Sequence, residues 1–229
     1  MNAEYTARTR LLIGDAAMEK LSQSFVAVVG LGGVGGTCAE ALARSGVGRL
    51  LLVDADTVSE SNLNRQLVSE KRTLGQRKTQ AMAARICAVS DAETAIADAF
   101  VTNDNVSSVL PVGLDFIVDA IDSVEGKAAL ASFAFSNNVP VIGCLGTGNR
   151  LDPMQLTVTS VYETEGDPLA RKLRNLLRKK NIANYPVVFS REAPQAKKGQ
   201  TVVGSFMPVT SAAGLLLASY VIQNLQKGA

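Results

Sequence analysis

A glycine-rich turn followed by a carboxylate is the first pattern in this chain that could do chemistry. Segment 30–36 holds five glycines and stands between an apolar run, 25–29, and a helical pattern, 37–44. Glycines let the backbone approach a phosphate, and the first turn of a helix offers free N–H groups. Asp54 ends the next apolar run, about 20 residues further on, where a carboxylate can bind ribose hydroxyls. The pattern predicts a nucleotide site without deciding which nucleotide binds.

Three charged residues beyond this turn favour chemistry at a phosphate over hydride transfer. Arg65 follows Asp54 closely, and Lys78 stands in the sequence GQRK. An enzyme that attacks an α-phosphate needs such cations, because negative charge builds up there in the transition state. Asp122 follows a central apolar run and is placed to hold Mg²⁺ against a triphosphate. A nucleotide-binding module without catalysis is an alternative, and the complete set of cations argues against it.

The elements that must position these residues alternate between apolar runs and helical patterns. Strands are expected at 25–29, 50–53, 92–101, 114–120 and 139–143, and helices at 37–44, 76–89, 103–110 and 124–135. This alternation predicts an α/β fold, a doubly wound, Rossmann-like and mainly parallel sheet. Because ligands bind beyond the carboxyl ends of such strands, Gly33, Asp54 and Asp122 are expected to share one crevice.

The 229 residues are predicted to form a single domain in three parts. These are N-terminal helices at 1–24, a nucleotide-binding core at 25–148 and a C-terminal strand and helix extension at 149–229. The extension is expected to contain strands at 155–162 and 187–190, helices at 168–180 and 211–225, and a polar loop at 191–200. Helix 168–180 carries six Lys and Arg residues and no acid. Such a helix suits phosphate contacts, although it is also typical of a solvated amphipathic helix.

Composition excludes several classes of protein. The chain has no histidine, which removes the commonest general base and the Ser/His/Asp arrangement. Its formal net charge is only +2, so no strong global field favours nucleic acid or membrane. The three cysteines, Cys38, Cys87 and Cys144, form no CxxC motif, and we expect small core residues rather than nucleophiles or zinc ligands.

The termini and apolar runs predict a cytoplasmic protein that does not enter a membrane. The first ten residues, MNAEYTARTR, lack the apolar core of a secretory signal. The longest apolar run, 212–222, is too short to span a bilayer. An odd number of cysteines without a signal peptide also indicates a reducing compartment.

Four motifs together resemble the adenylyltransferase family of ubiquitin-activating enzymes, of the ThiF/MoeB type. They are GxGGxG, DADTVSESNLNRQ, GQRK and DAIDS, which occur in family order and spacing between residues 8 and 148. The resemblance implies a nucleotide fold that binds ATP and Mg²⁺ and attaches AMP to a carboxylate with release of pyrophosphate. It also implies a homodimer, in which Arg8 reaches into the partner subunit's site.

The resemblance assigns roles to residues at matching motif positions. Gly33 would lie by the phosphates, Asp54 would bind the ribose and Asp122 would hold the metal, while Asn62, Arg65 and Lys78 would hold the phosphates. The catalytic residues it implies are Arg65, Lys78 and Asp122. The nucleotide-binding set it implies comprises Arg8, Gly30, Gly32, Gly33, Gly35, Asp54, Ser61, Asn62, Arg65, Lys78, Asp122 and Lys127.

Within this family the chain is most similar to the branch of tRNA threonylcarbamoyladenosine dehydratases. That branch is indicated by DAIDSVEGK, GTGNRLDP, the basic helix, FSREAP and the ending GSFMPVTSAAGL. It implies ATP-dependent cyclisation of a modified adenosine beside the tRNA anticodon, and it leaves a sulfur-transfer partner protein open. The alternative is an adenylyltransferase that activates the C-terminus of a sulfur-carrier protein. That branch typically adds zinc-binding and reactive cysteines after the sheet, and here no cysteine follows Cys144.

Overall fold

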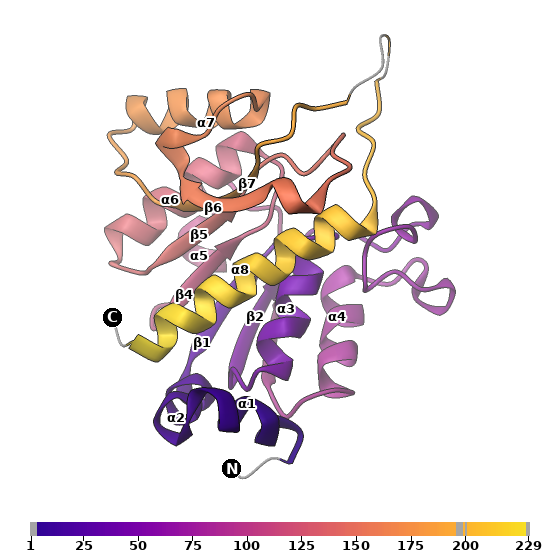
Figure 1. The fold of residues 1–229 in the computed structure, drawn as a ribbon, viewed down its shortest axis with the longest axis vertical. Helices are drawn as coiled ribbons and strands as arrows, with labels where there is room; N and C mark the ends of the chain where they lie inside the picture. The colour runs from indigo at the N-terminus through magenta and orange to yellow at the C-terminus, as the bar shows by residue number, and fades with distance from the viewer. Residues whose placement is uncertain (1–3, 196–198, 200, 228–229) are drawn as a thin grey trace.

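The computed structural model describes residues 4–195, 199 and 201–227, which form a seven-stranded sheet between two layers of helices (Figure 1). The strands are β1 (Phe25–Val29), β2 (Arg49–Val53), β3 (Glu93–Ala97), β4 (Phe116–Asp119), β5 (Val141–Cys144), β6 (Leu156–Ser160) and β7 (Pro186–Ser190). The helices are α1 (Ala7–Ile13), α2 (Asp15–Gln23), α3 (Gly35–Arg44), α4 (Lys78–Cys87), α5 (Val106–Val109), α6 (Val124–Ser136), α7 (Pro168–Lys179) and α8 (Met207–Lys227). Short 3-10 turns lie at Glu4–Thr6, Glu60–Asn62, Lys71–Thr73, Pro153–Gln155 and Val161–Glu163.

The strand order is β3-β2-β1-β4-β5-β7-β6, and each neighbouring pair is parallel except β6 and β7. The mainly parallel, doubly wound sheet expected from the sequence is therefore confirmed. β2, the next strand in the chain after β1, pairs with one edge of β1, and β4 pairs with its other edge. The order reverses between β1 and β4, which is where open α/β sheets bind their ligands.

The apolar strands are buried because helices cover both faces of the sheet. β1, β2, β4 and β5 are buried along almost their whole lengths, as expected of central parallel strands. One core cluster joins the sheet to α2, α3, α4 and α8, and the other joins the opposite face to α5, α6 and α7. α8, the long yellow helix in Figure 1, crosses the sheet beside α3 and packs the end of the chain against α2 and α3.

Several predicted boundaries differ from the observed ones. α3 begins at Gly35, two residues earlier than predicted, and α8 begins at Met207 and ends at Lys227, so it exceeds the predicted 211–225. β3 and α5 are shorter than predicted, since β3 is an edge strand with little buried surface. Residues 196–198 and 200 of the predicted polar loop lie outside the described residues. Among the helices that are described, none is long and apolar enough to cross a membrane.

Candidate active site

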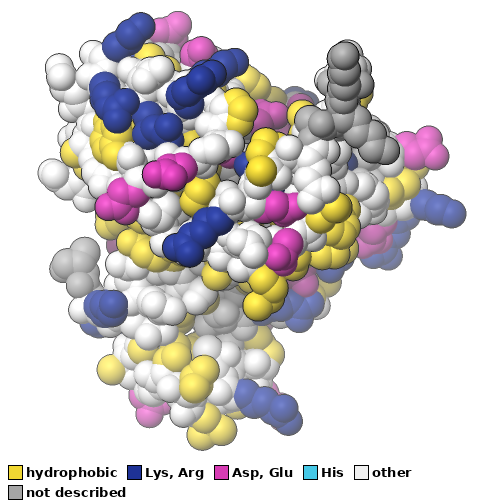
Figure 2. Space-filling view, turned by 45° about the horizontal axis from the view of Figure 1, so that its top comes forward, with side chains coloured by type: hydrophobic (Ala, Val, Ile, Leu, Met, Phe, Trp, Pro, Cys, Tyr) yellow, Lys and Arg dark blue, Asp and Glu magenta, His cyan; other side chains and the backbone are white. Residues whose placement is uncertain are grey.

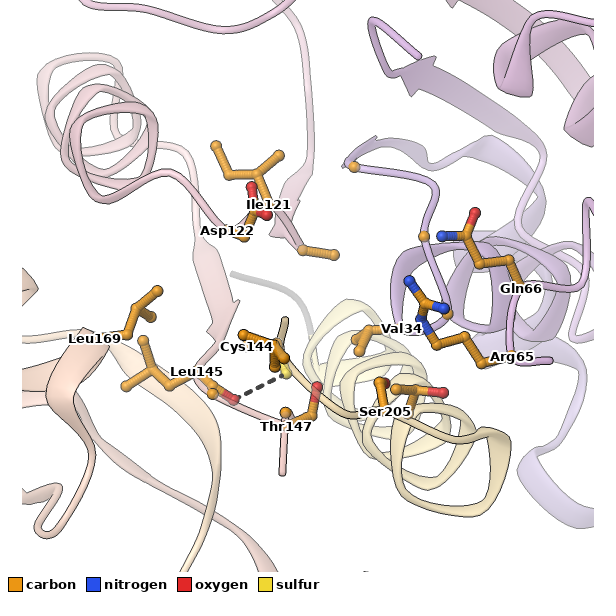
Figure 3. Close-up of a pocket in the computed structure, with 18 of the residues that line it drawn as sticks. Val34, Arg65, Gln66, Ile121, Asp122, Cys144, Leu145, Thr147, Leu169 and Ser205 are labelled. Atoms are coloured by element: carbon orange, nitrogen blue, oxygen red, sulfur yellow. Dashed lines mark hydrogen bonds between the residues drawn. The ribbon is translucent and has the colours of Figure 1, made fainter. Parts of the chain in front are cut away.

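A cavity of about 720 Å³ lies beyond the carboxyl ends of the strands. It is lined at one end by the turn after β1 and the residues that follow β2 and β3, including Gly30, Asp54 and Phe100. The residues after β4 lie in the middle, and those after β5, together with the start of α7, line the other end. This volume is typical of a small-ligand site. In Figure 3, Val34 and Arg65 lie on one side of the cavity, and Asp122 and Leu169 on the facing side.

The glycine turn brings the start of α3 against the sheet and leaves it open to the cavity. Gly30 has φ +90°, and a Cβ there would lie 2.7 Å from Ala120 O, just beyond the end of β4. A Cβ on Gly35 would lie 1.7 Å from Gly30 O, so only glycine permits this close turn. Val34, the N-cap of α3, offers no side-chain cap, so the helix presents its positive end to the cavity. The turn can therefore cradle an anion.

Asp54 and Lys78 meet beside the glycine turn. Asp54 Oδ2 accepts a 2.6 Å hydrogen bond from Leu31 N, which fixes its carboxylate at the end of β2. Lys78 is 5% exposed, and its Nζ lies 3.8 Å from Asp54 Oδ1 and 2.7 Å from Asp56 Oδ2. Asp56, which is not among the predicted site residues, thus holds the Lys78 ammonium together with Asp54. A ligand phosphate could take the place of the exposed Asp56 carboxylate on this cation.

Arg65 and Asn62 face the cavity from the segment after β2. Asn62 closes a capping box with Ser59, which fixes the turn before Arg65. The Arg65 guanidinium donates to Ser61 O at 2.9 Å and to Asn64 Oδ1 at 2.8 Å. These neutral partners leave its positive charge without an acidic neighbour among the described residues. Gln66, the last residue of the motif DADTVSESNLNRQ, lines the same wall.

Asp122 lies across the cavity from Arg65 and is exposed to it. The N-cap of α6 is the next residue, Ser123, whose side chain accepts from Gly126 N at 3.2 Å. No group of three His, Cys, Asp or Glu side chains that could hold a metal occurs within the described ranges. Asp122 therefore offers a single carboxylate, which is a donor set that fits Mg²⁺ when phosphates and water complete the coordination.

Lys127 lies below the cavity instead of lining it, unlike Arg65 and Lys78. Its Nζ donates to Asp119 Oδ1 at 2.9 Å and to Cys144 O at 2.7 Å, and the side chain is fully buried. Burial raises the pKa of Asp119, and the charge and hydrogen bond of Lys127 oppose that rise. The pair ties the end of β4 to the end of β5, so Lys127 supports the Asp122 loop from outside the cavity lining.

Three more residues of the predicted set lie outside the cavity lining. Gly35 packs inside the turn, and Ser61 contributes its carbonyl to Arg65. Arg8 is exposed on α1, at the end of the molecule where the strands begin (Figure 1). α1 packs on α2, and the residue after α2, Ser24, accepts a backbone hydrogen bond from Arg49 N at the start of β2. These contacts place α1 at the end of the sheet opposite the cavity. Arg8 therefore cannot reach the cavity of its own chain.

The cysteines fit the prediction of inert core residues in two cases of three. Cys38 and Cys144 are buried, and burial raises the pKa of the Cys144 thiol to about 12. Cys87 is exposed at the end of α4, so the prediction of a core residue was wrong there. Cys144 touches the cavity, but its thiol stays protonated at neutral pH and is a poor nucleophile.

The far end of the cavity contains a charged pair that no motif assigned. Arg150 and Asp167 are 3% and 5% exposed, and Arg150 Nη2 lies 4.0 Å from Asp167 Oδ2. Both residues line the cavity. Arg150 lies in the segment GTGNRLDP and Asp167 directly precedes the basic helix, but neither is among the predicted site residues. A signal was present, because Arg150 is the one charged residue between Lys127 and Asp152 and follows a glycine-rich strand end.

Comparison with known proteins identifies the class of protein. The model of the ThiF family matches residues 6–228, so the chain belongs to the ThiF family. A Bacillus subtilis protein named tRNA threonylcarbamoyladenosine dehydratase is 36% identical over 239 residues, which cover 96% of this chain and 94% of that protein.

Solved structures agree with the sequence comparison. Crystal structures of Escherichia coli tRNA N6-threonylcarbamoyladenosine dehydratase in complex with AMP and with ATP match this fold with a TM-score of 0.92. Each is 35% identical to this chain and covers 98% of it, and the match spans 94% of the solved chain. The match therefore includes the C-terminal extension as well as the nucleotide-binding core.

Proposed function

We propose that this protein is an ATP-dependent tRNA threonylcarbamoyladenosine dehydratase, which closes the threonylcarbamoyl group of a modified adenosine into a ring. One observation carries the proposal. A single cavity joins the glycine turn, Asp54, Arg65, Lys78 and Asp122, which come from parts of the chain that are far apart in sequence. Membership of the ThiF family and the two dehydratase relatives support the same reading.

The nucleotide is ATP, with its adenosine end toward β2 and its phosphates over the glycine turn. Asp54 binds the ribose, because its carboxylate is held at the end of β2 where dinucleotide and mononucleotide folds place that group. The positive end of α3 faces the phosphates, and Asn62, Arg65 and Lys78 surround them. Asp122 is the residue that would hold Mg²⁺ together with the phosphates, and the ion would supply charge neutralisation there.

The first chemical step forms an acyl-adenylate. An oxygen of the substrate carboxylate attacks the α-phosphorus, and the bond from that phosphorus to the pyrophosphate oxygen breaks. Arg65 and Lys78 stabilise the charge that spreads over the phosphoryl oxygens in the transition state. Both cations are in place before reaction, since Arg65 is tied to Ser61 O and Lys78 to Asp56.

The second step closes the ring without an enzyme nucleophile. The ureido nitrogen attached to the base attacks the acyl carbon, and AMP leaves with one oxygen of the original carboxylate. The nitrogen loses its proton, so the nucleoside loses the elements of water overall. A thiol with a pKa of about 12, such as Cys144, is not required for either bond change.

The tRNA docks over α7 and the open end of the cavity. Figure 2 shows Lys and Arg side chains gathered at the upper left, over α7. The exposed cations of this helix and its C-cap are Arg171, Lys172, Arg178, Lys179 and Lys180. Because α7 begins at the cavity, phosphates on its surface would bring a nearby loop of RNA to the acyl end of the site. A tRNA substrate also implies a cytoplasmic protein.

The active form is a homodimer whose sites are completed across the interface. Arg8 is exposed and remote from its own cavity, so a role in the reaction requires a second copy of the chain. The apolar side chains around it fit this reading, since Leu11 is 88% exposed and Leu12 is 84% exposed. A sulfur-transfer partner protein remains a prediction from the family resemblance alone.

Two titrations and one turnover assay test the proposed function. Calorimetry should detect ATP binding and no comparable NAD binding, because the cations suit a triphosphate; NAD binding without ATP binding would contradict the proposal. AMP release should then depend on tRNA that carries threonylcarbamoyladenosine. Release triggered instead by a sulfur-carrier protein would favour the alternative, a carrier adenylyltransferase.

A further inference from the structure

Arg150 and Asp167 form a buried polar pair whose hydrogen-bonding capacity is incomplete. Arg150 Nε and Nη1 and Asp167 Oδ2 have no hydrogen-bond partner in the part of the chain that the structure describes. Buried polar atoms are rarely left in this state, because each costs the desolvation energy of an unpaired group. Since both side chains line the cavity, a bound ligand is the natural partner.

The pair is held rigidly by its surroundings. Asp167 Oδ1 accepts from Leu169 N at 2.7 Å and Ala170 N at 3.1 Å, so one carboxylate oxygen caps α7 and the other stays unpartnered within the described residues. A Cβ on Gly146 would lie 2.2 Å from Asp167 Oδ2, so the strand-end loop packs directly on that carboxylate. Glu192 Oε2 accepts from the two backbone N–H groups that follow Arg150, at 2.9 Å each.

The charges of the pair define the chemistry of the ligand that fits. A ligand carboxylate would be attracted by Arg150 but repelled by Asp167, because Asp167 Oδ2 lies only 4.0 Å from Arg150 Nη2. A ligand cation would be attracted by Asp167 but repelled by Arg150. A neutral planar group that presents a carbonyl oxygen to Arg150 and an N–H to Asp167 satisfies both residues at once. An amide or a urea has this pattern on adjacent atoms.

We propose that Arg150 and Asp167 form the subsite for the ureido group of the substrate, with Arg150 donating to its carbonyl oxygen and Asp167 accepting from its N–H. The inference rests on the proposed function, which supplies a substrate with a ureido group next to the carboxylate. The N–H in question belongs to the threonyl-side nitrogen. The base-side nitrogen must remain free, because it closes the five-membered ring, and closure by the other would give a three-membered ring.

This subsite orients the substrate for both steps. It holds the ureido group at the α7 end of the cavity, while Arg65 and Lys78 lie toward the nucleotide end. A fixed ureido plane aims the carboxylate at the α-phosphate and then the base-side nitrogen at the acyl carbon, which reduces the entropy cost of each step. Arg150 and Asp167 are thus specificity-determining residues for the substrate, distinct from the cations that act on the phosphates.

The test uses the full-length protein and synthetic anticodon stem–loop RNAs. One RNA carries threonylcarbamoyladenosine, and the other carries the same nucleoside methylated on its threonyl-side ureido nitrogen. The variants are Arg150→Gln and Asp167→Ser, because serine keeps a helix cap and removes the unpartnered oxygen. Arg191→Gln, at an exposed arginine next to the same loop, is the matched control. Calorimetry of ATP binding checks that each variant retains its fold and nucleotide site.

We expect the parent protein to prefer the unmethylated RNA by on the order of 10²-fold in kcat/KM, since the methyl group leaves Asp167 unpaired. Asp167→Ser should abolish this preference, and Arg150→Gln should raise KM for RNA about 10- to 100-fold, with the ATP Kd unchanged. The inference is overturned if Asp167→Ser retains the preference or if Arg150→Gln leaves KM unchanged. Failure of the parent protein to convert the unmethylated RNA would instead overturn the proposed function.

Discussion

Lys127 Nζ donates a 2.9 Å hydrogen bond to Asp119 Oδ1 beneath the cavity floor, and both side chains are almost completely buried. This ion pair joins α6 to the last residue of β4, and through Cys144 O it also reaches β5. The position of the Asp122 loop therefore depends on a pair that lies outside the cavity lining.

Breaking this pair should destabilise the fold more than it impairs nucleotide contacts. Lys127→Met leaves the Asp119 carboxylate buried without its cation, which should cost about 3 to 5 kcal/mol of unfolding free energy. Replacing both partners, as Lys127→Met with Asp119→Leu, should recover much of that loss. Denaturant unfolding measures both effects. An unchanged unfolding midpoint for Lys127→Met would show that the pair contributes nothing to stability.

Arg65 should act on the transition state more than on ATP binding. Arg65→Ala is expected to lower turnover on the order of 10²-fold, because a preorganised cation is removed where negative charge develops, while the ATP Kd changes far less. Lys78→Ala should lower the rate similarly and also release Asp54 and Asp56 from their cation. Arg72→Ala, at an exposed arginine, is the control. Equal losses of affinity and rate would make Arg65 a ground-state ligand.

Arg8 should complete the site of a partner subunit. Arg8→Ala and Arg65→Ala are each expected to be nearly inactive alone, but mixing the two variants so that subunits exchange should restore about a quarter of parental activity. Half of the dimers are then hybrids, and each hybrid has one of its two sites intact. Sedimentation should give a dimer for all three proteins. An active monomer, or full activity of Arg8→Ala alone, would refute the shared site.

The basic face of α7 should make tRNA affinity depend on salt. Replacing Arg171, Lys172 and Lys179 by glutamine is expected to weaken tRNA binding and to flatten the slope of log affinity against log salt by roughly one unit for each phosphate that is no longer neutralised. Arg174 is kept, because its guanidinium donates to Thr164 O at 2.6 Å and supports the fold. Identical slopes for parent and variant would mean that α7 is a solvated face.

Glu40 should account for part of the acid sensitivity of the fold. Burial raises its pKa, but hydrogen bonds and charge from Arg85 and Arg44 outweigh burial and hold the pKa below its usual 4.5. Stability from a lowered pKa is present above the unfolded value and is lost as pH falls below about 4.5 through the folded pKa. Glu40→Gln should be less stable at neutral pH, with a flatter decline in acid. The exposed Glu93→Gln is the control, and an unchanged acid profile in Glu40→Gln would refute the assignment.

Sequence patterns predicted the sheet and grouped residues that line the glycine-turn end of the cavity, because both depend on local features. Apolar strands and a glycine turn have short-range signatures, and Asp54, Arg65 and Asp122 follow from strand ends that meet at one edge. Side-chain direction was not predictable in the same way. Lys127 sits in a motif beside Asp122, yet it projects from α6 into the protein interior.

The far end of the cavity depends on contacts between segments that are distant in sequence. Arg150 and Asp167 come from different segments, and only the packing of α7 against the loop after β5 brings them within 4.0 Å. Asp167 also caps α7 through Oδ1. A sequence pattern can predict this cap, but it does not predict that the second carboxylate oxygen, Oδ2, lies near Arg150. Asp56 lies in the motif DADTVSESNLNRQ, but its ion pair was not predicted for a similar reason, since its partner Lys78 is 22 residues away.

The proposed dehydratase activity is tested most directly by the product of a single reaction. Purified protein, ATP, Mg²⁺ and tRNA carrying threonylcarbamoyladenosine should yield, after digestion, a nucleoside lighter by one water, formed in equal amount to AMP and dependent on ATP. Mass spectrometry of the nucleosides and chromatography of AMP measure both. An unchanged nucleoside together with ATP-dependent adenylation of a sulfur-carrier protein would contradict the proposed dehydratase function.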